Sequence, residues 1–402
     1  MGGEFDVLIV GAGPAGSFAA ERLARGGARV ALFDGRPPAD AKACGGGVTS
    51  KALKAWPFLH EAGGRTVSEV EMYAPAGGRV RLQLDEPFAI YSRRALDSYL
   101  CGRARAAGAE VFAGRVSGPK ERDGAGLWTV RGAGGESWRG RVLVGADGAN
   151  SPIAKRLAGP LANSEMEVAF GYRTPLGEDE EAPTVIAFLP GWAGYAWAFP
   201  RLDHISFGIA TSQDAFDHKA LDRLLWEFMV GYYLTRGGED VPLWHANAGA
   251  GRVEVEEELR RVADRYAARI PGLAPETLER RRAAGEGWAL VGDAAGFADP
   301  VTGEGIYYAL RSAELFAEAF LAGAPSSYEE RWRADFGREL HRAARMRRRF
   351  YGSFWGGPFT DRMIKFARLH PGIRRTLREL VAGDQGYVGL KRTLARRALR
   401  PL

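Results

Sequence analysis

The hydrophobic and polar positions change their pattern along the chain, and the first pattern is that of a buried strand. Residues 5–10 form an apolar run with little alternation, which is typical of a parallel strand buried on both faces. Apolar residues then recur with helical spacing over 15–25, and a second apolar run follows at 28–33. The chain is therefore expected to begin with a strand, a helix and a second, parallel strand.

The next hundred or so residues are expected to alternate between short strands and one helix. Weak alternation over 67–84 predicts a pair of strands at an exposed edge. Helical spacing over 94–107 leads to a short strand at 110–112. The runs 127–130 and 137–144 together predict a β-meander.

A different pattern begins near residue 168. Aromatic-rich strands alternate between apolar and polar positions from 168 to 210, which indicates an antiparallel sheet. A helix is expected over 221–233, and a short buried strand at 288–291 leads through a glycine-rich turn to a helix over 305–321. The residues that follow are helical in pattern and rich in arginine.

Composition narrows the class of protein only slightly. Hydrophobic residues make up 46% of the 402 residues and charged residues 26%, which is typical of an ordered globular protein. The net charge of +6, from arginines scattered along the chain, is compatible with an anionic cofactor or an anionic membrane surface. Cys44 and Cys101 form no disulfide framework, and the six histidines lack zinc spacing, so no metal site is expected. No nucleic-acid partner is expected either.

The sequence also bears on where the protein is found. Its first residues have neither the basic start nor the apolar stretch of a signal peptide. The apolar window 224–234 is too short to span a bilayer and contains Glu227. A cytoplasmic protein is expected, and peripheral contact with the inner face of the membrane is left open.

A glycine-rich turn follows the first strand and begins the first helix. Gly11 permits the tight turn, Gly13 lets the backbone approach a pyrophosphate, and Gly16 lets helix and strand pack closely. Asp34 ends the second strand, where a carboxylate accepts hydrogen bonds from an adenosine ribose. A glycine turn without a ligand is the alternative, but the register of all these parts favours a dinucleotide site. Its predicted residues are Gly11, Gly13, Pro14, Ala15, Gly16 and Asp34.

A second glycine-rich run, between 290 and 306, favours FAD over NAD. A flavoprotein must also hold a ribityl chain and a tricyclic ring, and a late Gly-Asp turn serves that purpose. Asp293 is expected to accept hydrogen bonds from ribityl hydroxyls, and the following helix N-terminus is expected to face the pyrimidine edge of the flavin. The residues predicted to bind here are Gly292, Asp293, Gly303, Gly305 and Ile306.

These motifs resemble those of the flavoprotein superfamily that includes para-hydroxybenzoate hydroxylase and geranylgeranyl reductase. The segment 93–97 resembles the Arg-x-x-Leu-Asp helix start of that superfamily, whose arginine lies near the flavin, which implies a cofactor role for Arg93. The segment 145–148 resembles its second Asp-Gly motif, which implies such a role for Asp147. A surface charge at a helix start and a turn-forming aspartate are the respective alternatives.

A third motif resembles one particular family, the geranylgeranyl reductases. The hexapeptide YAWAFP at 195–200, followed by GIA at 208–210, is similar to the signature YxWxFP and GxG, with alanine in place of the second glycine. On a strand, Tyr195, Trp197 and Phe199 share one face. The resemblance implies that these three and Pro200 form the substrate wall, with Tyr195 and Trp197 also at the catalytic centre. Core packing is the alternative.

The loop around Cys44 resembles the Cys-Gly-Gly loop that lies beside the isoalloxazine ring in the same family. Cys44, Gly45 and Gly46 are accordingly expected to contact the cofactor, because glycines let the backbone lie against a flat ligand. Cys44 is also the candidate proton donor near the reacting carbon. A small apolar filler is the alternative for this cysteine.

The sequence thus predicts an α/β protein with a Rossmann-type FAD-binding domain, an inserted antiparallel β-sheet domain and a C-terminal helical segment. The expected boundaries are 1–65, 94–160 and 275–325 for the FAD-binding domain, 66–93 and 161–274 for the substrate domain, and 326–402 for the helical segment.

The resemblance implies an FAD-dependent reductase of isolated C=C bonds in prenyl chains, acting on an apolar lipid substrate. The alternatives are a flavin-dependent monooxygenase or halogenase on the same scaffold, or a membrane-associated flavin electron-transfer protein or quinone reductase. NADPH or a reduced electron-carrier protein is the expected donor, although no second nucleotide motif is seen. The arginine-rich tail is either a docking surface for anionic lipid or a solvated helical face.

Overall fold

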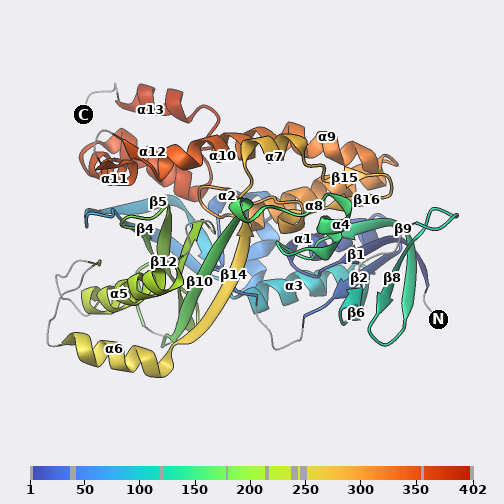
Figure 1. Cartoon of the computed structure of the whole chain (residues 1–402), viewed down its shortest axis with the longest axis horizontal. Helices are drawn as coiled ribbons and strands as arrows, with labels where there is room; N and C mark the ends of the chain where they lie inside the picture. The colour runs from blue at the N-terminus through green and yellow to red at the C-terminus, as the bar shows by residue number, and fades with distance from the viewer. Residues whose placement is uncertain are drawn as a thin grey trace. The chain divides into compact units, whose positions relative to one another are not determined.

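The computed structural model describes residues 3–36, 42–117, 122–177, 180–212, 217–236, 243–244, 251–354 and 357–398. The predicted fold class is confirmed: the protein is α/β, with a Rossmann-type sheet, a second large sheet and C-terminal helices (Figure 1). The chain forms two compact units. Unit 1 comprises Met1–Lys42, Arg93–Glu165 and Ile270–Ala344, and unit 2 comprises Ala43–Ser92, Met166–Arg269 and Arg345–Leu402.

Unit 1 is built on an eight-stranded sheet with a parallel centre. Its order is β15-β16-β9-β1-β2-β6, and β8 pairs with both β9 and β7. The strands are β1 (Glu4–Val10), β2 (Val30–Asp34), β6 (Glu110–Ala113), β7 (Val116–Ser117), β8 (Trp128–Gly132), β9 (Ser137–Gly145), β15 (Ala284–Gly285) and β16 (Trp288–Leu290). Val7, Leu8 and Ile9 have no exposed surface, as the apolar run predicts for a central parallel strand.

The first helix of unit 1 packs against both strands and other helices of that unit. The helix α1 (Pro14–Arg25) contacts β1, β2, α3 (Arg93–Ala106) and α8 (Ile306–Leu321). The other helical segments are α4 (Pro152–Leu157), η2 (Asn163–Glu165), α7 (Pro275–Arg280), η4 (Gly292–Ala294), η5 (Pro325–Ser327), α9 (Tyr328–Trp332), η6 (Arg333–Gly337) and α10 (Arg338–Phe350), which continues into unit 2.

Unit 2 is built on a second eight-stranded sheet. Its order is β14-β10-β13-β12-β11-β4-β5-β3. The strands are β3 (Gly47–Val48), β4 (Arg65–Tyr73), β5 (Arg79–Ile90), β10 (Met166–Pro175), β11 (Val185–Phe188), β12 (Gly194–Pro200), β13 (His204–Ser212) and β14 (Asp264–Pro271). The expected antiparallel pairing holds between β10 and β13, between β13 and β12, between β12 and β11, and between β4 and β5. In contrast, β11 and β4 run parallel.

The expected pair of strands over 67–84 is present, but its placement at an edge of the sheet is wrong for β4, which lies between β11 and β5. The placement holds for β5, because β3 pairs with β5 only at Ala89 and Ile90. Moreover, α11 (Phe359–Leu369) and α12 (Pro371–Ala382) pack on β5, so helices near the end of the chain cover its alternating apolar positions.

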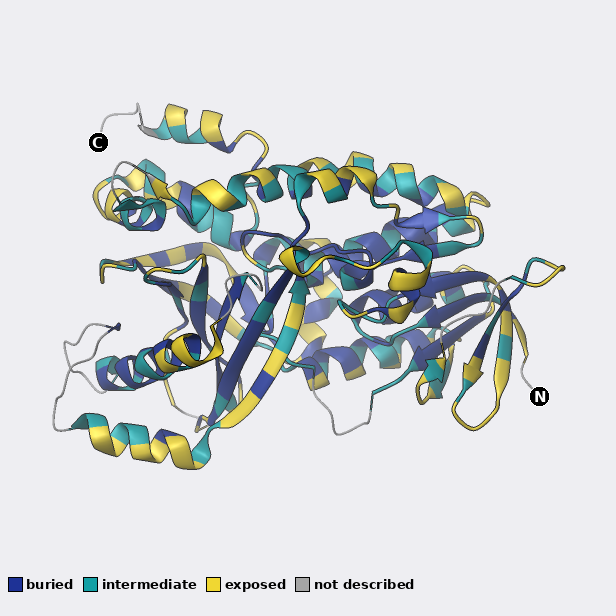
Figure 2. Ribbon diagram, viewed as in Figure 1, coloured by how far each residue is buried: buried dark blue, intermediate teal, exposed yellow. Residues whose placement is uncertain are grey.

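Helices cover unit 2 in two separate apolar clusters. The helix α5 (His218–Arg236) packs on β12 and β13, and its Leu221 and Phe228 are buried with Ala196 and Ala198 of β12. The second cluster joins Val70 and Leu82 to residues of α11 and α12. The strands β12 and β13 are largely buried, whereas α6 (Gly251–Val262) is half-buried or exposed along most of its length (Figure 2). The remaining elements are α2 (Ser50–Ala55), η1 (Pro57–Ala62), β17 (Ser353–Phe354), β18 (Gly357–Pro358) and α13 (Leu390–Ala398).

These units divide the chain differently from the sequence-based boundaries. Residues 43–65 pack in unit 2, where β3 pairs with β5, although the sequence assigned them to the FAD-binding domain. Residues 345–402 also pack in unit 2 rather than forming a separate helical region.

Candidate functional site

The turn between β1 and α1 requires glycine at two positions for steric reasons. Gly11 has a φ of +108°, and a Cβ there would lie 2.3 Å from the carbonyl oxygen of Ala146. A Cβ on Gly16 would lie 1.8 Å from the carbonyl oxygen of Gly11. Strand and helix therefore approach as closely as backbone atoms allow, as expected from the sequence.

Gly13 differs, because space is open above it. Its φ of −73° suits any residue, and the nearest atom to a Cβ there would be Nη2 of Arg93, 4.0 Å away. No side chain caps the N-terminus of α1, and the hydroxyl of Ser17 donates to the carbonyl of Ala12 at 3.0 Å to brace the turn. The result is an open cradle at a helix N-terminus, which is suited to a phosphate group.

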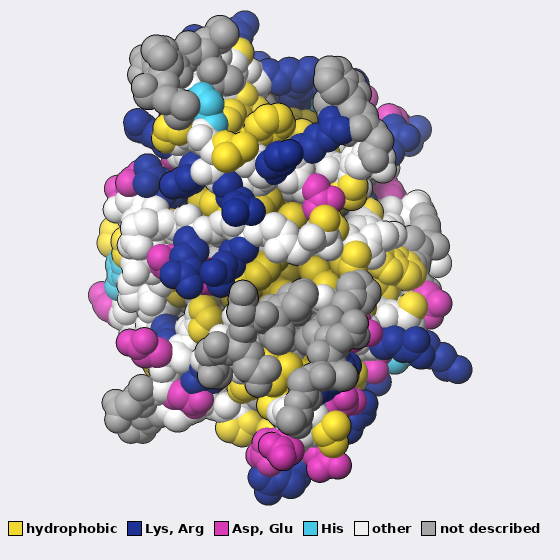
Figure 3. Space-filling view, turned by 90° about the vertical axis from the view of Figure 1, so that its left-hand side faces the viewer, with side chains coloured by type: hydrophobic (Ala, Val, Ile, Leu, Met, Phe, Trp, Pro, Cys, Tyr) yellow, Lys and Arg dark blue, Asp and Glu magenta, His cyan; other side chains and the backbone are white. Residues whose placement is uncertain are grey.

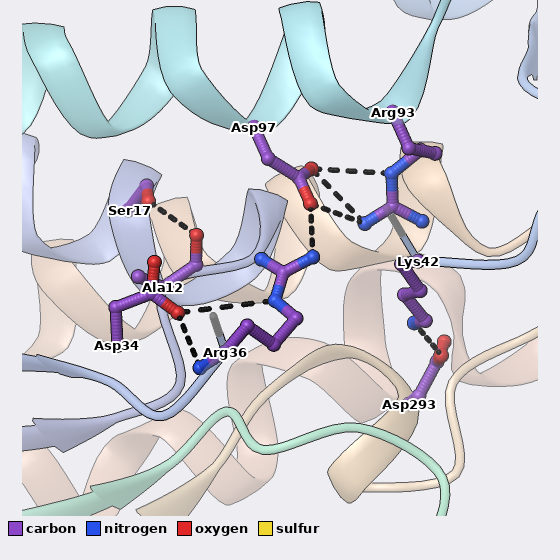
Figure 4. A network of polar contacts seen from close by, with 8 residues as sticks. All are labelled: Ala12, Ser17, Asp34, Arg36, Lys42, Arg93, Asp97 and Asp293. Carbon is purple, nitrogen blue, oxygen red and sulfur yellow. Dashed lines mark hydrogen bonds and ion pairs between the residues drawn. The ribbon is translucent and has the colours of Figure 1, made fainter. Parts of the chain in front are cut away.

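A charged network surrounds this cradle in unit 1 (Figure 4). The guanidinium of Arg93, which is only 3% exposed, donates to both carboxylate oxygens of Asp97 at 3.0–3.1 Å. Arg36 donates to the same carboxylate at 2.7 Å, and its backbone N–H donates to Asp34 at 3.2 Å. Asp34 thus ends β2 beside Arg36, and Arg93 is fixed with its charge near Gly13.

Asp293 faces a lysine that sequence reasoning did not single out. Lys42 Nζ donates to Asp293 Oδ2 at 2.9 Å, and a Cβ on Gly148 would lie 4.0 Å from the same Nζ (Figure 4). On the other side, a Cβ on Gly305 would lie 3.1 Å from Asp293 Oδ1. Gly305 is the N-cap of α8 and has no side-chain cap, so the carboxylate and the helix N-terminus lie side by side.

The loop that carries Gly303, before Ile306 at the start of α8, is held by Asp299. The Asp299 carboxylate accepts the backbone N–H groups of Val301 and Thr302 at 2.7 and 3.1 Å, and its carbonyl accepts that of Gly303 at 2.8 Å. The late glycine-rich run therefore forms one compact turn that positions Asp293 and the start of α8.

Asp147 is a partly buried carboxylate at the end of β9. It accepts a hydrogen bond from the hydroxyl of Ser151, and the backbone N–H of Ile153 lies 3.5 Å from its second oxygen. Burial raises the pKa of Asp147 above its ordinary value, because the ionised carboxylate loses solvation.

An Asp147→Asn variant is expected to melt on the order of 2 °C higher at pH 7, because the ionised side chain costs stability there. Since the pKa of Asp147 is raised in the folded state, its protonated form favours folding. This contribution to the free energy of unfolding is fully present below the unfolded-state pKa and is lost as the pH rises through the folded-state pKa. The advantage of the variant should therefore shrink as pH falls toward about 4. Thermal melts across pH 4–8 at equal FAD occupancy measure this, and a lower Tm at pH 7 would contradict it.

Unit 2 contains the predicted aromatic stripe. The rings of Tyr195 and Trp197 lie 5.8 Å apart, and those of Trp197 and Phe199 6.3 Å apart. The intervening alanines point into the opposite cluster beneath α5, so the three aromatic side chains share one face of β12, and Pro200 ends the strand. A Cβ on Gly208, the cross-strand partner of Trp197, would lie 2.1 Å from the indole, which explains the glycine in the motif.

The Cys44 loop packs against this stripe. A Cβ on Gly45 would lie 3.2 Å from the ring of Phe199 and 3.3 Å from Nε1 of Trp197. Gly46 has a φ of +84°, and a Cβ there would lie 2.2 Å from the carbonyl oxygen of Tyr91. The N–H of Gly46 donates to the sulfur of Cys44 at 3.3 Å, so the glycines fix both the path of the loop and the thiol.

A buried arginine, which sequence reasoning also missed, anchors this loop. Arg201 is 4% exposed, and its Nη2 donates to the carbonyl oxygens of Cys44 at 2.5 Å and Gly45 at 3.1 Å. In the sequence, the only indication that Arg201 belongs to the site is its position directly after the YxWxFP segment.

Replacing Arg201 by methionine is expected to destabilise unit 2 by about 2–3 kcal/mol, because charged hydrogen bonds from a buried guanidinium to two partly buried carbonyls are lost. Arg201→Lys, which keeps the charge but not the fork, should lose less. Urea denaturation followed by tryptophan fluorescence measures both variants. Equal stability of wild type and Arg201→Met would contradict the anchoring role.

Together, the features of unit 1 fit FAD. The open cradle at Gly13 and the charge of Arg93 suit a pyrophosphate, Asp34 suits a ribose, and Asp293 suits a chain of hydroxyls. Within the described residues, no group of three or more His, Cys, Asp or Glu side chains is arranged to hold a metal ion.

Comparison with known proteins supports this assignment. The FAD binding domain family matches residues 4–173. Geranylgeranyl diphosphate reductase from chloroplasts of Oryza sativa subsp. japonica is 32% identical over 343 residues, covering 79% of this chain but just under two thirds of the rice protein, 66%. Its namesake from Synechocystis is 31% identical, covering 79% of this chain and 75% of that protein. Digeranylgeranylglycerophospholipid reductase 2 of Methanopyrus kandleri is 30% identical, covering 83% and 84%.

Solved structures share the fold. A geranylgeranyl bacteriochlorophyll reductase-like protein from Thermoplasma acidophilum superposes with a TM-score of 0.72 at 21% identity, covering 98% of this chain and 99% of the other. A flavin-dependent brominase gives a TM-score of 0.66 at 19% identity, with the same coverage. These likenesses show the fold alone, whereas the sequence relatives above assign the family. The chain belongs to the geranylgeranyl reductase family of FAD-dependent oxidoreductases.

Proposed function

We propose that the protein reduces isolated C=C bonds of a prenyl chain with electrons from FAD. The observation that carries this proposal is the aromatic stripe of β12, packed directly against the glycines that follow Cys44. An apolar face of three rings suits a long hydrocarbon chain, and relatives named for reduction of geranylgeranyl groups support the choice of substrate class.

In this proposal the cofactor is held by unit 1. The turn at Gly13 and the N-terminus of α1 bind the pyrophosphate, with the charge of Arg93 beside it. Asp34 accepts hydrogen bonds from the adenosine ribose, and Asp293 from the ribityl chain. Lys42 holds the Asp293 carboxylate in place until those hydroxyls take over its hydrogen bonds.

The side chains of unit 2 are assigned to the substrate. Reduced FAD, when bound, supplies hydride to one alkene carbon. An isolated alkene has no carbonyl to take up charge, so the other carbon needs a proton from a positioned acid. Cys44 is that acid in the proposal, with its sulfur held by the N–H of Gly46. Tyr195, Trp197 and Phe199 exclude water and hold the chain in one orientation.

The test is an anaerobic assay on the purified FAD-loaded protein with geranylgeranyl diphosphate, started by chemical reduction of the flavin. Mass spectrometry should show the substrate gaining the mass of one H₂ for each double bond reduced. Parallel reactions with NADPH and with reduced ferredoxin identify the donor by flavin bleaching. Oxygen-dependent hydroxylation or bromination, or rapid quinone reduction without alkene turnover, would overturn the proposal in favour of another flavin chemistry.

A further inference from the structure

Arginines occur along the whole chain, but the excess of basic over acidic residues is not spread evenly. Residues 357–398 contain ten Lys or Arg and three Asp or Glu. The whole chain has 55 and 49, so the remainder is left with 45 basic and 46 acidic residues and is almost neutral. The entire excess of positive charge therefore lies in the segment that forms α11, α12 and α13.

These three helices form a layer whose inner side packs against the strands β4 and β5. Ile364, Ala367 and Leu377 are buried in the cluster on β4 and β5. The next helix, α13, contacts α12. Arg397 of α13 donates to both carboxylate oxygens of Glu379 of α12 at 2.8 and 3.0 Å. The layer is thus firmly attached, and its outer side is a defined surface.

The acidic residues of the layer are already occupied by neighbouring groups. Asp361 accepts the backbone N–H of Ala76 at 2.9 Å, and Asp384 accepts Lys54 at 3.1 Å. Glu379 is shared between Arg397 of α13 and Arg375 of α12. These contacts leave the basic side chains of the outer side in excess.

Large apolar side chains are exposed among these charges. On α11, Phe366 is 55% and Leu369 66% exposed, on the side of the helix away from the buried Ile364 and Ala367. Val388, before α13, is 42% exposed. These are three of the six exposed large hydrophobic residues in the described part of the chain. Seven basic residues of the same three helices are also exposed: Lys365, Arg368, Arg374, Arg375, Lys391, Arg392 and Arg396.

We call this set of three apolar and seven basic side chains the tail surface. Figure 3 views the side of the molecule on which these helices lie, and it shows Lys and Arg gathered there with hydrophobic side chains between them. No helix in the described ranges is both long and apolar enough to cross a bilayer.

We propose that the tail surface docks the protein on an anionic lipid bilayer. Phe366, Leu369 and Val388 would enter the boundary between headgroups and acyl chains, while the basic side chains remain at the level of the lipid phosphates. This combination separates a bilayer from other polyanions, because a nucleic acid offers phosphate charge but no apolar layer for these three residues. A second copy of this chain would instead meet its own surplus of positive charge.

Vesicle co-sedimentation of the FAD-loaded protein tests the proposal. Binding is expected to vesicles of equal parts phosphatidylcholine and phosphatidylglycerol, and not to phosphatidylcholine alone. Raising NaCl from about 0.1 M to about 1 M should release most of the protein, because the screening length falls from about 10 Å to about 3 Å. Equal binding to both vesicle types, or no binding to either, would overturn the proposal.

Paired variants separate the two contributions. Lys365→Glu with Arg368→Glu should weaken binding by at least about 25-fold, at about fivefold for each basic residue. Phe366→Ser with Leu369→Ser should weaken it by about tenfold without changing the salt dependence. The matched controls are Lys155→Glu with Arg156→Glu, two exposed basic residues on α4, and Val253→Ser, an exposed apolar residue on α6.

Both controls should bind as the wild type does. Flavin absorbance and Tm, measured on each variant, report whether it is folded, and they are independent of the reaction proposed above. If the controls lose as much affinity as the tail variants, binding follows overall charge and the tail surface is not the docking site. Tighter binding to nucleic acid than to anionic vesicles would likewise overturn the proposal.

Discussion

A Gly13→Ala variant is expected to fold normally and to lose FAD. The backbone angles of Gly13 suit alanine, and the added methyl group meets no protein atom closer than 4.0 Å. The same methyl group would fill the cradle at the start of α1 where a pyrophosphate is proposed to lie. We expect FAD affinity to fall by about 100-fold or more, equivalent to about 3 kcal/mol of steric cost. Flavin fluorescence titration of the apoprotein measures this change.

A Gly16→Ala variant provides the matched comparison, because the same chemical change there acts on folding. Its methyl group would lie 1.8 Å from the carbonyl oxygen of Gly11, and backbone must move to admit it. We expect unit 1 to lose about 3 kcal/mol of stability or more even without cofactor. Thermal melts of the two apoproteins distinguish the variants. Equal FAD affinity for wild type and Gly13→Ala would remove the pyrophosphate from this turn.

Cys44→Ser is expected to lower turnover by about 100-fold or more while FAD stays bound. Serine can still accept the N–H of Gly46, so the loop should keep its path, but a hydroxyl is a far weaker acid than a thiol. Single-turnover alkene reduction by the pre-reduced enzyme isolates the step that needs the proton, and the flavin spectrum reports occupancy.

Cys101→Ser is the control for this experiment. Cys101 is the second cysteine of the chain, half-buried on α3, and burial raises the pKa of its thiol, as is typical of a packing residue. Its replacement should leave turnover unchanged. Unchanged turnover of Cys44→Ser as well would assign the proton to another group and reduce Cys44 to a packing role.

Local patterns in the sequence were sufficient for the parts of the fold that depend on neighbouring residues. The apolar run of β1, the turn at Gly11 and the start of α1 are consecutive in sequence, so their geometry follows from residue type alone. The same holds for the aromatic stripe of β12, because side chains of a strand alternate between its faces. The roles in binding or catalysis that the sequence suggests for these residues stay predictions.

Other features depend on segments far apart in the sequence, and local patterns contain no information about them. The alternation of β4 reads the same at an edge and in a sheet interior, because the strand that pairs with its outer side is β11, which lies far along the chain at Val185–Phe188. Lys42 pairs with Asp293 from 251 residues away, and Arg201 reaches Cys44 from 157 residues away. The concentration of basic residues in the tail could have been counted from the sequence, but their exposure could not.

The indole that covers Gly208 makes two positions on neighbouring strands behave as one. A side chain at 208 could be accommodated only if the ring at 197 became smaller, so the width of the aromatic wall is set by a residue that is not aromatic. Under the proposed substrate role of the stripe, the room for the substrate is therefore expected to change only when Trp197 and Gly208 are exchanged together, whereas either change alone would leave a clash or a hole.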